Sequence, residues 1–287
     1  MKNCLRSVLI FATLICLPFI TNVSAQTEKA ISGDGVDIAY TTSGQGEPAI
    51  VFIHGWSCDK SYWAEQIKTF LPKYTVVALD LAGHGESGLS RVNYTLDLFG
   101  EDVAGVVNKL GLKKVILVGH SMGGAVVIAA ANKLKGIVIG LIGADTFQNL
   151  GTTMPADQTV QFLKPFKENF VETTKAFVKT MFPATADSNL VKKVANDMAS
   201  AHPKVAVSAM ENMFADDGVA AIKELNVPII SINCDRYPIT EEANRKLVKH
   251  YEIKMMKGVG HFVMLEDPAT FDKLLQESID ELVNDKL

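Results

Sequence analysis

Ser121 stands in a glycine-flanked sequence that is typical of a nucleophilic serine. Residues 119–123 read Gly-His-Ser-Met-Gly, and another glycine follows at Gly124. Residues 114–118 predict a strand and residues 123–134 predict a helix, so the serine lies on a strand-to-helix turn. The flanking glycines remove side chains that would collide across such a turn. Free N–H groups at the helix N-terminus favour developing negative charge, which suits attack by the hydroxyl on a carbonyl carbon.

A nucleophilic serine needs a base that takes its proton, and we expect His261 to be this base. It follows the last predicted strand, 252–256, in a turn that contains Gly258 and Gly260 and that can approach Ser121. Imidazole suits the task because its unperturbed pKa lies near neutrality. The remaining histidines fit loop, helix or surface positions, and none has metal-ligand spacing with cysteines or carboxylates, so we expect no metal. They are His54, His84, His120, His202 and His250.

Three further motifs, together with the serine motif, resemble the α/β-hydrolase superfamily. His-Gly-Trp at 54–56 follows a predicted strand, and residues 80–87 resemble the family's D-x-x-G-x-G-x-S segment. Gly-His-Phe at 260–262, followed by Glu-Asp-Pro at 266–268, resembles its C-terminal histidine motif. The resemblance covers essentially the whole mature chain and indicates the branch with a helical cap. It implies a mostly parallel, doubly wound α/β sheet and a serine hydrolase without a cofactor.

The resemblance also implies an oxyanion hole made by two backbone N–H groups, those of Trp56 and Met122. Two preorganised donors aimed at a developing oxyanion contribute roughly 3–4 kcal/mol each in other enzymes. The sequence leaves open whether the Trp56 side chain lines the pocket or packs under the cap.

The carboxylate that would orient the base is left open. In the family it usually follows a late core strand, and here residues 233–238 read Asn-Cys-Asp-Arg-Tyr-Pro. Alignment on the proline puts Tyr237 at the acid position, with Asp235 two residues early. We expect Asp235 to complete the catalytic triad and Asp145 to be the alternative. A Ser–His dyad, or another carboxylate such as Asp80, also stays open.

The elements that must position these residues alternate between strand and helix, which predicts a mostly parallel sheet covered on both faces. The predicted strands cover 36–42, 49–53, 75–79, 114–118, 137–142, 227–232 and 252–256. The predicted helices cover 60–71, 96–110, 123–134 and 268–282. Residues 147–221 break this rhythm with a helical pattern rich in Phe and Met, and are too long for a loop. We therefore expect a core at 26–146 and 222–287 with a helical cap at 147–221.

The first 25 residues resemble a secretory signal peptide. Lys2 and Arg6 precede an apolar run at 9–20, and Val-Ser-Ala at 23–25 predicts cleavage before Gln26. The alternative is an uncleaved anchor, but the run is short for a bilayer span of roughly 20 residues. We expect export to the periplasm or the medium, with no stable membrane insertion after cleavage.

Charge and cysteine content limit the partners. The net charge of −4 becomes more negative when the basic leader is removed, which argues against a nucleic-acid partner. Cys58 and Cys234 remain in the mature chain, and the sequence does not settle whether they pair. Cys58 lacks the turn geometry of a nucleophile.

The resemblance implies hydrolysis of a small-molecule carboxylic ester through an acyl-enzyme on Ser121. The Phe- and Met-rich cap indicates a medium-sized apolar acyl or alkoxy group. Lactonase, C–C bond hydrolase and cofactor-free haloperoxidase reactions stay open, because fold does not fix substrate. A ligand-binding or sensory protein without turnover is the alternative from another class, favoured by Tyr237 at the expected acid position.

Overall fold

An eight-stranded sheet forms the centre of the computed structural model, which describes residues 26–216 and 218–284. The expected signal peptide lies outside these residues. The strands are β1 (Glu28–Ile31), β2 (Asp37–Ser43), β3 (Ala49–Ile53), β4 (Val76–Leu79), β5 (Val115–His120), β6 (Val138–Ala144), β7 (Ile229–Cys234) and β8 (Tyr251–Met256). Their order is β1-β2-β4-β3-β5-β6-β7-β8, with β2 antiparallel to both neighbours and all later pairs parallel. Nearly every residue of the central strands is buried, as expected for a sheet covered on both faces.

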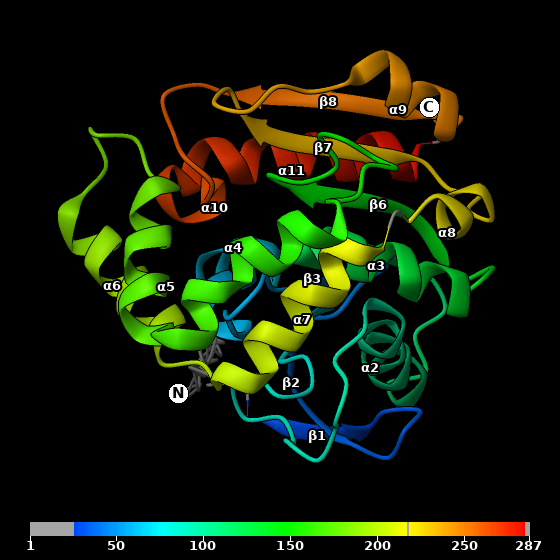
Figure 1. Ribbon diagram of the computed structural model, residues 1–287. Coiled ribbons are helices and arrows are strands. Elements are labelled where there is room, and N and C mark those ends of the chain that lie inside the picture. Colours follow the sequence, from blue (N-terminus) through cyan, green and yellow to red (C-terminus); the bar gives the residue numbers. More distant parts are fainter. Residues whose placement is uncertain (1–25, 217, 285–287) are drawn as a thin grey trace, which may run out of the picture.

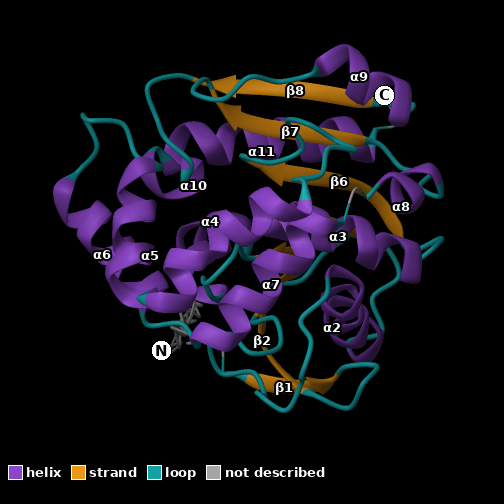
Figure 2. Cartoon of the chain, in the orientation of Figure 1, coloured by secondary structure: helices purple, strands orange, loops and turns teal. Residues whose placement is uncertain are grey.

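Helices cover both faces of this sheet (Figure 2). On one face α2 (Leu96–Lys109) packs against α3 (Met122–Lys133), which lies on β5 and β6. On the other face α11 (Pro268–Val283) packs against α1 (Ala64–Phe70) and against β6, β7 and β8. The doubly wound α/β-hydrolase fold predicted from the sequence is therefore confirmed.

The strand register brings the carboxyl ends of four parallel strands to one edge. Ile53 of β3 lies beside Gly119 of β5, and Ala144 lies beside both His120 of β5 and Ile232 of β7. The loops that leave these strands therefore start side by side. In open α/β sheets this edge is where ligands bind.

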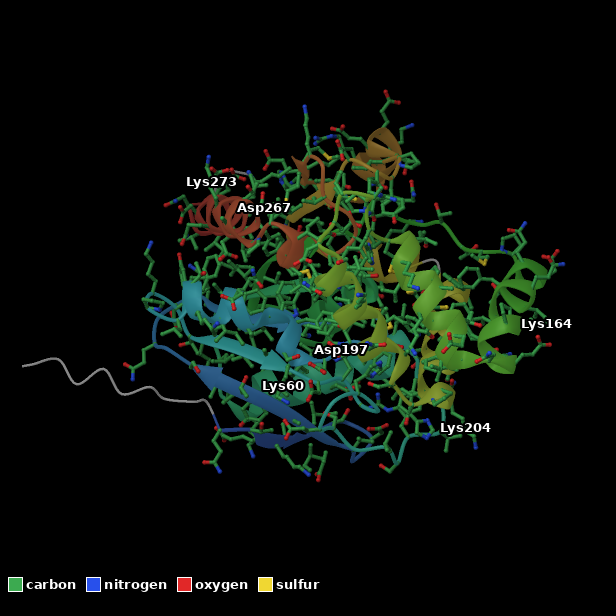
Figure 3. The ribbon with its side chains drawn as sticks, turned by 90° about the vertical axis from the view of Figure 1, so that its left-hand side faces the viewer. Lys60, Lys164, Asp197, Lys204, Asp267 and Lys273 are labelled. Atoms are coloured by element: carbon green, nitrogen blue, oxygen red, sulfur yellow. The ribbon has the colours of Figure 1, made fainter. Side chains whose placement is uncertain are left out.

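Between β6 and β7 the chain forms a group of helices, α4 (Ala156–Glu168), α5 (Phe170–Thr180), α6 (Ser188–Ala199) and α7 (Pro203–Ala215), followed by the short α8 (Val219–Lys223). The group is coloured green to yellow in Figure 1. Lys164 and Lys204 point outward from it (Figure 3), whereas Phe166 and Met210 are buried beneath it. This is the segment expected as a cap, and the domain boundaries at 147 and 221 stay a prediction.

Several short elements were not predicted. The edge strand β1 was missed, because four residues are too few for a periodic pattern. The helix expected at 60–71 divides into a 3-10 turn, Lys60–Trp63, and α1. Two further short helices, α9 (Glu241–Leu247) and α10 (Val263–Glu266), flank β8. Across residues 26–216 and 218–284, no helix has the length and apolarity needed to span a membrane.

Candidate active site

Ser121 occupies a strained turn between β5 and α3. Its backbone has φ 52° and ψ −118°, a conformation that L-residues rarely adopt and that functional sites retain. A Cβ on Gly119 would lie 2.3 Å from the carbonyl oxygen of Gly123, so the turn requires glycine there. The Ser121 side chain is half-buried and faces a cavity. The sequence-based expectation of a strand-to-helix turn at this serine agrees with the geometry.

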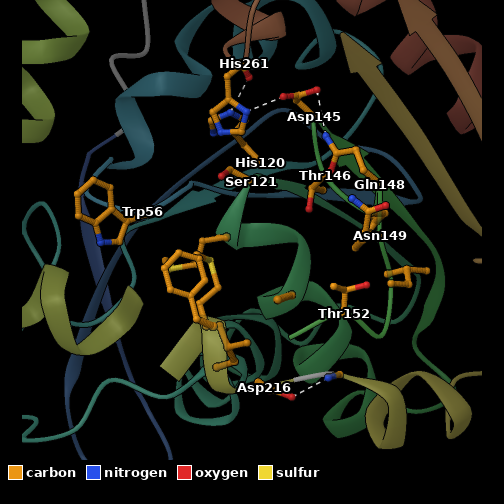
Figure 4. A pocket seen from close by; sticks show the side chains of 18 of the residues that line it. Trp56, His120, Ser121, Asp145, Thr146, Gln148, Asn149, Thr152, Asp216 and His261 are labelled. Atoms are coloured by element: carbon orange, nitrogen blue, oxygen red, sulfur yellow. Dashed lines mark hydrogen bonds and ion pairs between the residues drawn. The ribbon is translucent and has the colours of Figure 1, made fainter. Parts of the chain in front are cut away.

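His261 lines the same cavity, and its imidazole is held against Asp145 (Figure 4). Asp145 Oδ2 lies 2.5 Å from His261 Nδ1. The other carboxylate oxygen accepts hydrogen bonds from the backbone N–H of Cys234 (3.0 Å) and from Gln148 Nε2 (3.2 Å). The Asp145 side chain is fully buried. When Nδ1 donates its proton to the carboxylate, Nε2 is left as the ring atom that can take a proton from a serine.

The structure brings Asp145, the alternative, and not Asp235 to the base. Asp235 Oδ1 accepts a long hydrogen bond from the backbone N–H of Gly258 (3.4 Å), and in the described chain no hydrogen bond joins it to His261. Asp80 is also occupied elsewhere, because its two oxygens accept hydrogen bonds from the Lys60 backbone and side chain (both 2.7 Å). The contact expected between Asp235 and His261 is therefore not found, and the carboxylate that contacts His261 is that of Asp145, at the end of β6 and next to β7 in the sheet.

The segment that carries Asp145 is strained and is anchored by buried polar groups. Asp145 and Phe147 both have positive φ values, 46° and 66°. Asn244 Nδ2 donates to the carbonyl oxygens of Phe147 and Gln148 (both 2.9 Å), and Tyr251 donates its hydroxyl proton to the Phe147 oxygen (2.8 Å). Sequence reasoning missed Asn244, which is fully buried although it lies on an otherwise exposed short helix. These contacts hold the segment that carries Asp145 in position.

Two backbone N–H groups are free at the position expected for an oxyanion hole. In the described part of the chain, neither the Trp56 nor the Met122 N–H has a hydrogen-bond acceptor. The Trp56 side chain both lines the cavity and packs under the cap. Its Nε1 donates to the carbonyl oxygen of Ala206 on α7 (2.7 Å), and its ring meets those of Phe166 and Phe177 edge-on.

The cavity above Ser121 has a volume of about 750 Å³. Core residues form its floor and cap residues its roof, so the cap encloses the space where a substrate would meet the serine. Side chains of Phe and Met provide most of the roof: Phe177, Met181, Met198, Met210, Met213 and Phe214. A largely apolar cavity with a few convergent polar groups is typical of a small-molecule site.

The family model of the "Alpha/beta hydrolase family" matches residues 50–274. The chain belongs to the alpha/beta hydrolase family. A non-heme haloperoxidase of Rhodococcus erythropolis is 27% identical over 271 residues, covering 85% of this chain and 93% of that protein. A 3-oxoadipate enol-lactonase of Acinetobacter baylyi is 23% identical, covering 87% and 95%. The solved structure of an esterase from Exiguobacterium antarcticum has a TM-score of 0.81 at 19% identity, covering 89% and 100%.

In this alpha/beta hydrolase three other histidines are buried near the site. Burial lowers the pKa of His54 to about 4 and that of His84 to about 3, and it lowers the pKa of His120 well below its usual value. His54 Nε2 accepts a hydrogen bond from the backbone N–H of Leu81 (3.0 Å). His120 Nε2 lies 3.0 Å from the carbonyl oxygen of His261, so a neutral His120 can donate to it. These neutral rings support the loops around the base.

Cys58 and Cys234 are buried free thiols in this structure. Burial raises the pKa of the Cys58 thiol far above its usual range and that of Cys234 to about 12. A thiol is nucleophilic only as the thiolate, so neither competes with the serine. In the part of the chain that the structure describes, no group of three or more His, Cys, Asp or Glu residues could hold a metal ion.

Proposed function

We propose that this alpha/beta hydrolase cleaves small carboxylic esters through a covalent acyl-enzyme on Ser121. The observation that carries the proposal is the placement of a strained elbow serine and an Asp145-paired histidine on one largely apolar cavity. Each of these features has a specific purpose in acyl transfer. A protein that only binds ligands would not need the three together.

The first half of the reaction forms the acyl-enzyme. Ser121 Oγ attacks the ester carbonyl carbon while His261 Nε2 takes the hydroxyl proton. The carbonyl oxygen becomes an oxyanion, which the free N–H groups of Trp56 and Met122 stabilise. Asp145 holds the ring and stabilises its cationic form. The protonated imidazole then gives its proton to the leaving alkoxide, and the alcohol departs.

The second half releases the acid. A water molecule attacks the acyl-serine carbonyl while His261 Nε2 again takes a proton. The tetrahedral intermediate collapses, the C–Oγ bond breaks, and the imidazole returns its proton to Ser121. All proton transfers use the same base, so the cycle needs no cofactor.

A relative supports a second substrate form, the cyclic ester. A relative named 3-oxoadipate enol-lactonase covers 87% of this chain, and a lactone undergoes the same acyl transfer with its alcohol still attached. Another relative, covering 85% of this chain, is named a non-heme haloperoxidase.

Hydrolysis of p-nitrophenyl esters from acetyl to octanoyl by the chain from Gln26 tests the proposal. We expect turnover by the parent with an optimum at medium acyl length, because the cavity is apolar and about 750 Å³ in volume. Ser121→Ala should abolish it. Equal turnover by parent and variant would refute the role of Ser121, and a set of lactones run alongside would separate the two substrate forms.

A further inference from the structure

The cavity has two chemically different walls that extend away from the serine. One wall is apolar and comes from α7, with Met210, Met213 and Phe214. A second wall comes from the segment after β6, which contributes the polar side chains of Thr146, Gln148, Asn149 and Thr152 beside the apolar Phe147 and Leu150. Figure 4 shows Thr146, Asn149 and Thr152 along this second wall, with Asp216 at the end of the cavity away from His261. Asn149, Thr152 and Asp216 are exposed, so this end opens to solvent.

The wall formed by the segment after β6 carries polar side-chain groups that are free to bond to a ligand. Its backbone is bonded to the core at two positions. The Thr146 N–H donates to Asn233 Oδ1 (3.1 Å) and the Thr146 carbonyl oxygen accepts from Ser231 Oγ (2.6 Å), while the Leu150 N–H donates to Asn244 Oδ1 (2.9 Å). In contrast, the hydroxyls of Thr146 and Thr152 and the Asn149 amide have no hydrogen-bond partner within the described residues. A fixed backbone with free side-chain donors and acceptors is a preorganised surface for a polar ligand group.

The charged side chains of the cavity lining are carboxylates. The lining contains no lysine or arginine among the described residues. Among the described residues its carboxylates are Asp145, which is paired with His261, and Asp216, of which Oδ1 accepts a hydrogen bond from the Gly218 N–H (2.7 Å). Arg236 is not itself part of the lining, and its guanidinium donates to the carbonyl oxygen of the lining residue Thr180 (3.3 Å). A ligand carboxylate would therefore lose water without gaining a cationic partner and would face Asp216.

We propose that this cavity selects uncharged, amphipathic ligands, namely chains with one apolar side and a hydroxyl or amide group several carbons from the reacting carbonyl. The apolar side lies on the α7 wall, and the distal polar group bonds to the wall formed by Thr146, Asn149 and Thr152. The same chain ending in a carboxylate is rejected. The inference rests on the proposed function only for the identity of the bond that is cleaved. The ligand preference does not depend on it.

Binding to the Ser121→Ala protein tests the preference without turnover. The probes are primary amides of six to ten carbons in three forms: a terminal methyl, a terminal hydroxyl and a terminal carboxylate. Calorimetry should show the hydroxyl form binding about threefold more tightly than the methyl form at the best length, as one net hydrogen bond predicts. The carboxylate form should bind at least about tenfold more weakly than the methyl form. Equal binding of all three forms would overturn the inference.

Two variants assign the preference to its residues, and one provides a control. Thr152→Val should reduce the advantage of the hydroxyl form, and Asp216→Asn should reduce the penalty of the carboxylate form. Glu211→Gln removes a carboxylate on α7 outside the cavity lining and should change neither ratio. If Glu211→Gln reduces the penalty as much as Asp216→Asn does, the effect is general charge and the assignment to the cavity is wrong.

p-Nitrophenyl esters of the same chains, given to the parent protein, separate the two claims. The ranking of kcat/KM should follow the ranking of affinities. Turnover without the ranking would overturn the ligand preference and leave the esterase proposal in place. The binding ranking without any turnover would contradict the esterase proposal and leave the ligand preference in place.

Discussion

At the scale of single residues, the acid shows what a sequence motif determines and what it does not. Ser121 and His261 lie among glycines that permit a tight turn, so a turn could be predicted at each of them. The acid has no such surroundings. Ala144 and Ile232 are neighbours in the sheet, so the loops that carry Asp145 and Asp235 begin side by side. Asp145 has a positive φ in the conformation that turns its carboxylate toward His261, and no residue type in the sequence signals that conformation.

Exchanging the two candidate acids for their amides tests this assignment. We expect Asp145→Asn to lower kcat by about 10³- to 10⁴-fold, because the amide cannot stabilise the imidazolium and favours the wrong ring tautomer. Asp235→Asn should lower kcat by less than about threefold, since its contact is a long bond to the Gly258 backbone. Steady-state kinetics on a p-nitrophenyl ester gives both values, and the reverse order would restore Asp235 as the acid.

At the scale of elements, the periodic segments were predictable and the short irregular ones were not. The strand at 49–53 and the helix that begins at Pro268 could be predicted from their hydrophobic patterns. The segment that carries Asp145 has no period. Its conformation depends on partners far away in the sequence, above all on Asn244, which bonds to the backbone of Phe147, Gln148 and Leu150. Such contacts appear only when α9 is packed against the segment.

We predict that Asn244→Leu weakens both the fold and the chemistry. Leucine is similar in volume, but it leaves the Leu150 N–H without an acceptor. It also removes one of the hydrogen bonds that the Phe147 and Gln148 carbonyl oxygens accept, although Tyr251 and Thr240 still donate to them. The free energy of unfolding should therefore fall by about 2 kcal/mol. The acid should also move, so kcat should fall by about tenfold while KM for a small ester changes less. Urea unfolding and steady-state kinetics measure the two effects.

Glu242→Gln provides the control for that variant, because Glu242 is exposed on the same helix. It should change neither stability nor kcat. A loss of stability in Asn244→Leu with an unaltered kcat and pH profile would limit Asn244 to a structural role.

At the scale of the whole molecule, the cap and the core are joined at the active site. The Trp56 indole donates to the cap at Ala206, and the His261 N–H donates to the cap at the Met181 carbonyl (2.9 Å). The Phe and Met pattern of 147–221 was sufficient to predict a helical layer. It could not predict these two hydrogen bonds, because they depend on how the layer is docked. Trp56 and His261 are therefore positioned partly by the cap.

The buried histidines predict loss of stability in acid. Burial lowers the pKa of His54 from 6.5 to about 4 and that of His84 from 6.5 to about 3. Below the unfolded pKa the unfolded chain binds protons that the folded chain refuses, so the free energy of unfolding falls as the pH drops. Each ring should contribute a loss of about 2 kcal/mol between pH 7 and pH 5.

Urea unfolding at the two pH values measures this loss. His84→Gln removes one of the rings, so the difference between pH 7 and pH 5 should shrink by about 2 kcal/mol relative to the parent. An unchanged difference would show that His84 is not kept neutral by the fold.

The most direct test of the central claim is covalent labelling of the nucleophile. An activated p-nitrophenyl phosphonate should release one p-nitrophenol per protein molecule and leave one phosphonyl group, because phosphonyl-serine resists the hydrolysis that frees an acyl-serine. Peptide mapping by mass spectrometry should place the label on Ser121, and Asp145→Asn should slow the labelling strongly. Labelling at another residue, or equally fast labelling of Ser121→Ala, would contradict the account.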